Sequence, residues 1–241
     1  GGIPYIAIQA LVGVALTQPL TLGMQLVFVV LFGIWMLKEK LERIEKIGFF
    51  FLIVSPVFLA LGQVTPPDVD LNSTVFRTNL LLFIVPFVVI CFVTYALTKV
   101  FKENVTVIGL LAAFISGILF AIGALTNQVG VEILKADLDI ISVLIAVLFF
   151  VLMMGSNTLA TGIQQVAFQK GKIGIAIGVQ STANLMLAIV GGVWIFAQAI
   201  LNLPYFIIGI VFILIGNFLL MRFQARLEEI DLPDVVEDDE K

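Results

Sequence analysis

The nineteen residues from Pro19 to Leu37 contain only two polar side chains, Thr21 and Gln25. At about 1.5 Å per residue, a helix of this length crosses the roughly 30 Å hydrocarbon layer of a bilayer. The segment 38–46, KEKLERIEK, carries seven charged side chains among its nine residues, and a second apolar run begins at Ile47. This pattern predicts a membrane-spanning helix that ends in a charged collar at the membrane surface.

Apolar segments of similar length recur along the whole chain, separated by charged residues, glycines and prolines. Charged residues make up 12% of the sequence, about half of their share in soluble domains, so we predict an all-α polytopic membrane protein. Pro19 is expected to separate the first two helices as a tight hairpin, because one helix across both segments would be about 52 Å long. The eight expected helices are 3–17, 19–37, 47–64, 79–98, 105–130, 140–168, 173–196 and 204–221.

The basic residues of the predicted loops are distributed unevenly when the helices are threaded alternately through the membrane. One side receives ten basic residues, and the other receives only Arg77 and Lys135 together with several aspartates. By the positive-inside rule, the ten-residue side is cytoplasmic. We therefore expect an integral protein of the plasma (inner) membrane with both chain ends in the cytoplasm, where the acidic segment 223–241 forms a disordered tail.

The sequence matches itself when the stretch that begins near Gln25 is laid over the stretch that begins near Asn184. In this register Glu39 aligns with Gln198, and the only two tryptophans, Trp35 and Trp194, also align. The predicted topology inverts the two copies in the membrane, which is the organisation of many secondary transporters. We expect residues 78–222 to form a five-helix repeat and residues 1–66 to form the last three helices of the other. A ten-helix 5+5 protein would then have its first two helices outside this sequence.

The same features resemble a known superfamily. The helix 19–37, the collar Lys38-Glu39-Lys40-Leu41 and the following Lys46-Ile47-Gly48 are similar to the EamA-type repeat of the drug/metabolite transporter (DMT) superfamily. The stretch LKEKLERIEKIG also resembles part of NIPA-type magnesium transporters. The resemblance implies an alternating-access transporter, and the sequence departs from the superfamily pattern at Gln198, where a second glutamate is common.

Amide and hydroxyl side chains in the predicted spans are candidate substrate ligands. Polar groups inside a bilayer must find partners, which are either neighbouring helices or a substrate. Glu39 is a candidate gate or coupling group, and the alternative is a solvated ion pair of the collar. The candidate substrate-binding residues are Gln25, Phe28, Trp35, Asn157, Thr161, Gln164, Gln180 and Asn184.

The residue inventory limits the other functional classes. The sequence has no histidine, and its single cysteine, Cys91, lies in an apolar run. Triads with histidine and cysteine metal sites are therefore excluded within these residues, and we predict no enzyme, no catalytic or metal site and no cofactor. The predicted partners are a small polar or amphipathic metabolite and the lipid bilayer, with no nucleic acid and with a homodimer left open. The alternatives are a magnesium transporter and a membrane scaffold that transports nothing.

Overall fold

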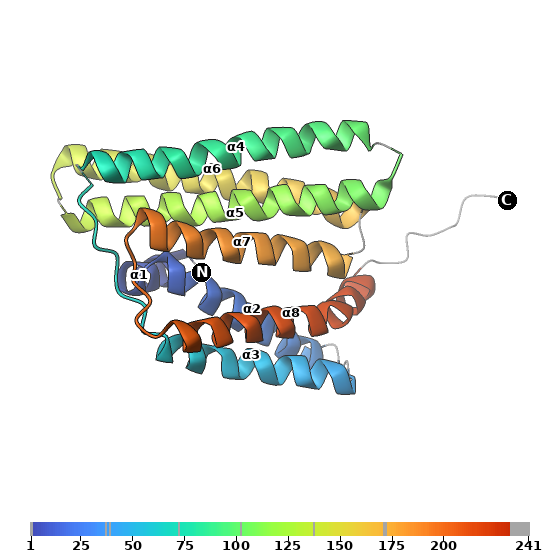
Figure 1. Ribbon diagram of the computed structural model, residues 1–241. Helices are drawn as coiled ribbons and strands as arrows, with labels where there is room; N and C mark the ends of the chain where they lie inside the picture. The colour runs from blue at the N-terminus through green and yellow to red at the C-terminus, as the bar shows by residue number, and fades with distance from the viewer. Residues whose placement is uncertain are drawn as a thin grey trace.

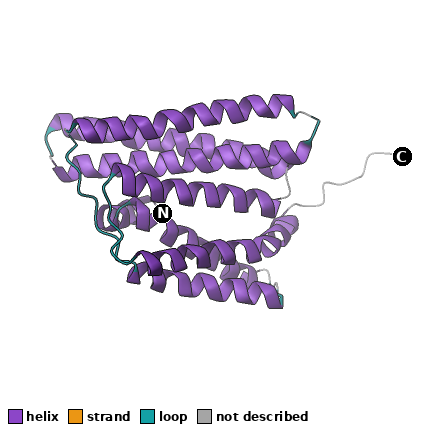
Figure 2. Cartoon of the chain, viewed as in Figure 1, coloured by secondary structure: helices purple, strands orange, loops and turns teal. Residues whose placement is uncertain are grey.

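The computed structural model describes residues 2–36, 38, 40–71, 73–101, 103–136, 138–170 and 173–231. Most of these residues belong to eight α-helices (Figure 1; Figure 2). The fold class is therefore all-α, as the sequence predicts. The helices are α1 (Gly2–Val12), α2 (Val14–Met36), α3 (Arg43–Leu61), α4 (Thr74–Val100), α5 (Val105–Ala136), α6 (Ile140–Lys170), α7 (Ile173–Ile195) and α8 (Leu203–Asp231).

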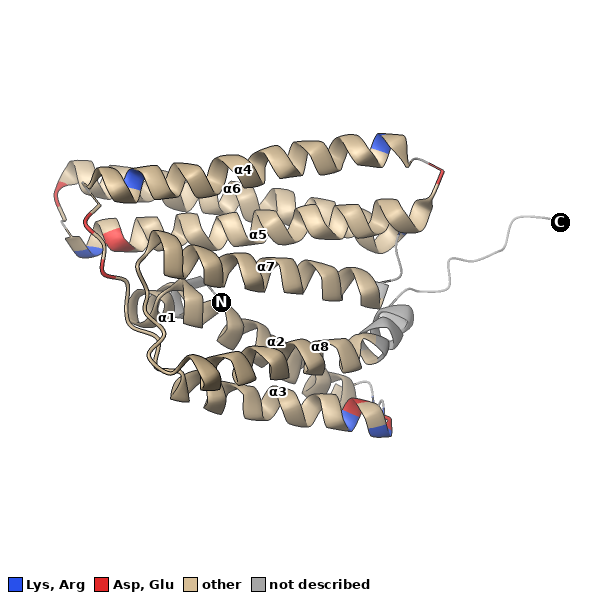
Figure 3. Cartoon of the chain, viewed as in Figure 1, with Lys and Arg blue, Asp and Glu red and all other residues tan. Residues whose placement is uncertain are grey.

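Seven of these helices, α2 to α8, are long and apolar enough to cross a membrane. Consecutive spans run in alternate directions, so the loops between them fall at the two ends of one bundle (Figure 1). Charged side chains gather at these two ends (Figure 3), with Arg43 at the start of α3 and Lys99 at the end of α4. The sorting of the described loops into two sides therefore agrees with the sequence, and the assignment of one side to the cytoplasm stays a prediction.

The break between the first two helices lies earlier than the sequence predicts. α1 ends at Val12, and Gly13 adopts a left-handed conformation with φ of +74°, which glycine reaches at least cost. α2 then begins at Val14 and continues through Pro19, which removes one helical hydrogen bond but requires no unusual φ. The expected helices 3–17 and 19–37 are therefore wrong in their shared boundary. α1, with 11 residues and about 16 Å of rise, is too short to span.

α5 is the most deeply buried of the spans and packs mainly against α6 and α7. Its face toward α7 includes Gly117, where an added Cβ would lie only 2.5 Å from the backbone oxygen of Gln180. The missing side chain lets the two backbones approach closely, as small residues commonly do between membrane helices. This approach fixes the middle of α7, which carries Gln180 and Asn184, between α5 and the rest of the bundle.

Helices α2, α3 and α8 form a second packed group, whereas α4 packs against α5 and α7. α3 lies along α8, where a Cβ on Gly48 would be 2.8 Å from Leu219 Cβ, and a Cβ on Gly216 would be 2.7 Å from Leu52 Cγ. α2 packs against both α3 and α7. A buried apolar cluster joins α2, α3 and α8 through Leu26, Val30, Leu52, Leu220 and Phe223. α2 is thereby held with one face toward α7.

Candidate functional site

A cavity of about 250 Å³ lies where α2, α6 and α7 meet, and we call it the amide cavity. Its polar lining is made by Gln25 of α2, Gln164 of α6, and Gln180, Ser181 and Asn184 of α7. Four of the eight predicted site residues therefore come together from three helices that are well separated along the chain. The remaining lining consists of aliphatic side chains and Phe168, so the polar groups are concentrated on an otherwise apolar wall.

The polar groups of the amide cavity are only partly paired with each other. Gln164 Nε2 donates a hydrogen bond of 2.9 Å to Gln180 Oε1, which joins α6 to α7. Asn184 Oδ1 is buried and accepts no hydrogen bond from the described residues. A buried acceptor without a donor costs about 1–3 kcal/mol. The cavity thus presents one acceptor whose hydrogen bond the described chain does not supply.

A smaller cavity of about 170 Å³ adjoins the amide cavity at Asn184, which lines both, and we call it the tyrosine cavity. Gln18 Nε2 donates to the Tyr5 hydroxyl on its wall. Asn157 of α6 also lines it, opposite Gly123 of α5, where an added Cβ would lie 2.4 Å from Asn157 Oδ1. Glycine at this position gives the Asn157 amide its room beside α5. A fifth predicted residue therefore belongs to the same polar region.

Three predicted residues do not line either cavity. Thr161 is exposed and donates to the backbone oxygen of Asn157 at 2.9 Å. The buried face of α6 carries Ala146, Ala160 and Ala167, and at 3.6 residues per turn Thr161 lies about a quarter turn from it. A hydroxyl side chain in the same predicted span as Asn157 and Gln164 is therefore too broad a criterion for a lining residue.

Phe28 and Trp35 are the other two predicted residues outside the cavities, with 51% and 78% of their surface exposed. The buried face of α2 carries Gly23, Leu26, Val30 and Gly33, so these aromatic rings lie on its outer face. The predicted gate residue Glu39 lies outside the described residues.

Sequence reasoning missed a group of buried amides between α1 and α5. Gln9 and Asn127 are fully buried; Gln9 Nε2 donates to Ala124 O at 2.8 Å, and Asn127 Nδ2 donates to Gln9 Oε1 at 2.6 Å. Ala124 also lines the tyrosine cavity. The polar region therefore extends from Asn184 into α5. Two adjacent amides, Asn127 and Gln128, inside an apolar run were the available sequence signal.

The next turn of α5 carries a buried carboxylate. Glu132 Oε1 accepts hydrogen bonds from Gln128 Nε2 at 2.7 Å and from Lys135 Nζ at 2.8 Å. The expected helix 105–130 stopped short of the observed end at Ala136, which placed Glu132 in a loop. Glu132 and Lys135 line a third cavity of about 620 Å³ at the end of the bundle, together with Asp68, Asp70 and Arg77. We call this cavity the charged vestibule.

Gln198 is buried as well, and its amide closes the break between α1 and α2. Gln198 Oε1 accepts from the Ala15 backbone N–H at 3.0 Å, and Nε2 donates to Val12 O at 2.9 Å and to Thr65 O at 3.0 Å. A helix end leaves carbonyls without partners, and a helix start leaves N–H groups without partners. An amide can serve both, whereas a glutamate carboxylate only accepts. A carboxylate at position 198 would leave Val12 O and Thr65 O without this donor, which accounts for an amide here.

Comparison of the chain with protein-family models, curated proteins and solved structures found no match. Within the described residues, no three His, Cys, Asp or Glu side chains gather as a candidate metal site. The geometry of the cavities is therefore the basis for assigning a function.

Proposed function

We propose that this chain belongs to a secondary membrane transporter that moves a small polar or amphipathic metabolite by alternating access. The observation that carries the proposal is the amide cavity, where Gln25, Gln164 and Asn184 from three helices face one space. The unpartnered Asn184 Oδ1 would recover its hydrogen bond from a substrate N–H or O–H group. A site of this kind is typical of ligand pockets, which combine apolar walls with a few convergent polar groups.

The helix bounds support an inverted repeat within the DMT-like arrangement. In the register that aligns Gln25 with Asn184, the bounds of α2, Val14 and Met36, fall on the bounds of α7, Ile173 and Ile195. The two helices run in opposite directions (Figure 1) and pack against each other. In transporters built from inverted repeats, the substrate site lies near the bilayer midplane between the copies. The amide cavity is lined by α2 and α7 together with α6, as expected of a site between such copies, and α4 to α8 would form the five-helix second copy.

The cavity linings favour an uncharged substrate group. The described side chains that line the amide and tyrosine cavities are amides, hydroxyls and apolar groups, without a carboxylate or a cation. Sites for Mg²⁺ usually include one or two carboxylates, so we propose a metabolite rather than the magnesium that the NIPA likeness implies. The charged vestibule would receive the substrate from one side, and the opposite end, which carries Arg43 and Lys99, would face the cytoplasm.

Uptake by the purified protein in liposomes tests this function directly. A panel of labelled neutral metabolites would be compared for saturable uptake, and Gln164→Leu would then be measured with the best substrate. Gln164→Leu removes the hydrogen bond to Gln180 and one amide of the cavity. Uptake should fall about tenfold, which corresponds to a loss of roughly 1.4 kcal/mol in binding free energy. Gln165→Leu is the matched control, because Gln165 is the neighbouring exposed amide and should leave uptake unchanged. Equal uptake by Gln164→Leu and Gln165→Leu, or no saturable uptake of any compound, would contradict the proposal.

A further inference from the structure

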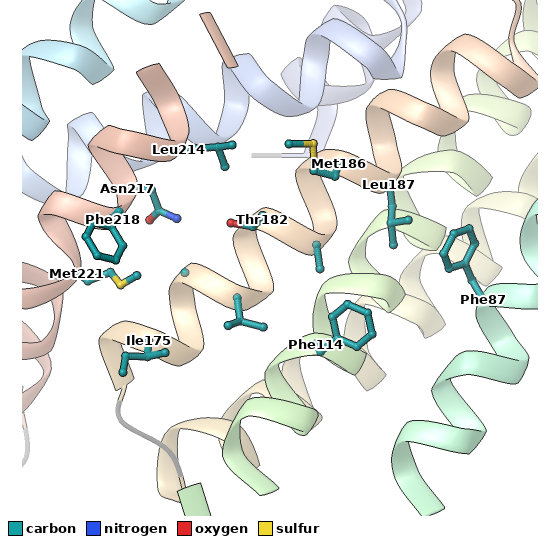
Figure 4. A pocket seen from close by; sticks show the side chains of 13 residues that line it. Phe87, Phe114, Ile175, Thr182, Met186, Leu187, Leu214, Asn217, Phe218 and Met221 are labelled. Atoms are coloured by element: carbon teal, nitrogen blue, oxygen red, sulfur yellow. The ribbon is translucent and has the colours of Figure 1, made fainter. Parts of the chain in front are cut away.

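A separate groove of about 500 Å³ lies on another side of α7, between α4, α5, α7 and α8 (Figure 4). It shares no lining residue with the amide cavity or the tyrosine cavity. Its wall is mostly apolar and includes Phe87, Phe114, Met186, Leu187 and Phe218. We call it the α7–α8 groove. Its volume lies within the range of about 300–1,000 Å³ that is usual for small-molecule sites.

Two polar side chains stand in this apolar wall. Among the lining residues, only Thr182 of α7 and Asn217 of α8 carry a hydroxyl or an amide, and they extend into the space between the two helices (Figure 4). Asn217 is 2% exposed, and its buried Oδ1 accepts no hydrogen bond from the described residues. Leaving such an acceptor without a donor costs about 1–3 kcal/mol. The groove therefore combines a long apolar wall with one acceptor, Asn217 Oδ1, that requires a hydrogen-bond donor.

The surroundings of the groove indicate where an occupant would come from. All four helices that line it are long and apolar enough to span a membrane, and Phe114, Met186 and Phe218 remain exposed at its surface. In a bilayer these residues meet hydrocarbon rather than water. A molecule that enters from this side carries an alkyl chain, and its polar end must donate a hydrogen bond to reach Asn217 favourably.

We propose that the α7–α8 groove binds a single-chain amphipathic lipid whose head group carries a hydroxyl, of the monoacylglycerol type. The hydroxyl donates to Asn217 Oδ1 beside Thr182, and the alkyl chain lies against Phe87, Phe114 and Leu187. The alkyl chain exchanges bilayer hydrocarbon for packing contacts with the groove wall, so it gains dispersion contacts rather than a transfer out of water. The hydroxyl supplies the donor that a plain hydrocarbon lacks. The site is distinct from the amide cavity, so it does not depend on the transport proposed above.

Photo-crosslinking of the purified chain in phosphatidylcholine nanodiscs tests the groove. The probe is a monoacylglycerol with a diazirine in its acyl chain, and labelled peptides are mapped by mass spectrometry. Label is expected on α4, α5 and α7 around Phe87, Phe114 and Leu187, where the proposed alkyl chain lies. Unlabelled monoolein should compete about tenfold better than methyl oleate, which has the same chain but no donor, because one hydrogen bond of about 1.4 kcal/mol corresponds to tenfold in affinity.

Three variants separate the groove from the other cavities. Asn217→Leu should lower labelling about tenfold, and Met186→Trp, which puts a larger side chain into the groove and keeps the Asn217 amide, should abolish it. Asn184→Leu makes the same amide-to-leucine change in the amide cavity and should leave labelling unchanged. If Asn217→Leu lowers the unfolding temperature, its loss of labelling could come from unfolding. The labelling of Met186→Trp then tests by itself whether the groove binds the probe.

Equal competition by monoolein and methyl oleate would overturn the proposed hydroxyl contact. Labelling that persists in Met186→Trp would overturn the site itself. A photoreactive residue at position 218 gives a further readout, because crosslinks from it into a second copy of the chain would show that a protein partner, rather than a lipid, covers the groove.

Discussion

Gln198 and Asn184 bury the same chemical group in the protein and use it in opposite ways. Gln198 is 1% exposed, and both atoms of its amide have partners: Oε1 accepts from Ala15, and Nε2 donates to Val12 and Thr65. Asn184 lies between two cavities, and its buried Oδ1 has no donor among the described residues. The two amides therefore differ in whether the described chain supplies their partners, and in the proposed site a substrate would supply the donor for Asn184 Oδ1.

The difference follows from the backbone near each residue. The break at Gly13 leaves the last carbonyl of α1 and the first N–H groups of α2 without helical partners. An amide beside the break can therefore hydrogen-bond to these backbone groups. Asn184 lies in the unbroken helix α7, whose backbone groups bond to each other. An amide on such a helix depends on side chains or on a ligand.

The largest expected effect is the loss of stability in Gln198→Leu. The substitution leaves Val12 O, Thr65 O and the Ala15 N–H without the amide that pairs with them, and each buried orphan costs about 1–3 kcal/mol. We expect a destabilisation of about 3 kcal/mol or more, measured by thermal or denaturant unfolding in detergent. Gln165→Leu, at an exposed amide, is the control with little change. Similar unfolding of the two variants would remove the distinction between Gln198 and an ordinary surface amide.

Gly13→Ala is expected to have the next largest effect at the same site. A Cβ at position 13 would lie 2.1 Å from Gln198 Nε2, and the φ of +74° disfavours any side chain. The left-handed conformation alone costs about 1–2 kcal/mol, and the contact displaces the amide from its partners. The unfolding temperature should fall, whereas Gly155→Ala, where an added Cβ would meet nothing within 4 Å in helix α6, should not destabilise the protein. If Gly13→Ala unfolds like Gly155→Ala, the break does not depend on glycine.

Asn184→Leu should lower substrate uptake and leave stability nearly unchanged, whereas Gln198→Leu lowers stability. Removing Asn184 deletes an acceptor that already lacks a donor, so stability should stay within about 0.5 kcal/mol of the parent or rise slightly. Substrate uptake in liposomes should nevertheless fall about tenfold, since a substrate hydrogen bond is lost. Measuring uptake and unfolding on the same preparation separates the two roles. Normal uptake together with a large loss of stability would make Asn184 a structural residue like Gln198.

Part of this contrast could be predicted from the sequence. The length of the apolar runs located the spans, because a bilayer fixes how many residues a helix needs. The internal match and the presence of amides in the predicted spans identified Gln25, Gln164 and Asn184 as candidates, and these three do line one cavity. The outward direction of Phe28 and Trp35 could not be predicted from that match, since an aligned pair does not reveal which face of a helix is buried.

The partners of the structural amides were beyond the sequence for a different reason. The break could have been placed at Pro19 or at Gly13, and only the tertiary contact with Gln198, near the other end of the chain, decides between them. The pairing of Gln9 with Asn127 likewise joins residues of the first and fifth helices. Whether a buried amide is satisfied depends on such contacts, and local pattern carries no information about them.

Asp139 gives the smallest expected effect and tests the role of burial in the comparison. Asp139 Oδ1 accepts the Ser142 backbone N–H at 2.8 Å at the start of α6, so its polar contact is as well formed as those of Gln198, but it is exposed to water. Hydrogen bonds from the Ser142 side chain and backbone hold the pKa of Asp139 below its usual range. Because the folded pKa lies below the unfolded value, the stabilisation is present above the usual pKa of about 3.9 and is lost as pH falls through the lower folded value. Asp139→Ala should therefore unfold slightly more easily than the parent at neutral pH, and the difference should shrink as the pH falls below the usual carboxyl pKa. A loss as large as that of Gln198→Leu would show that a formed hydrogen bond matters equally in water and in the protein interior, whereas a small loss assigns the importance of the Gln198 amide to its burial.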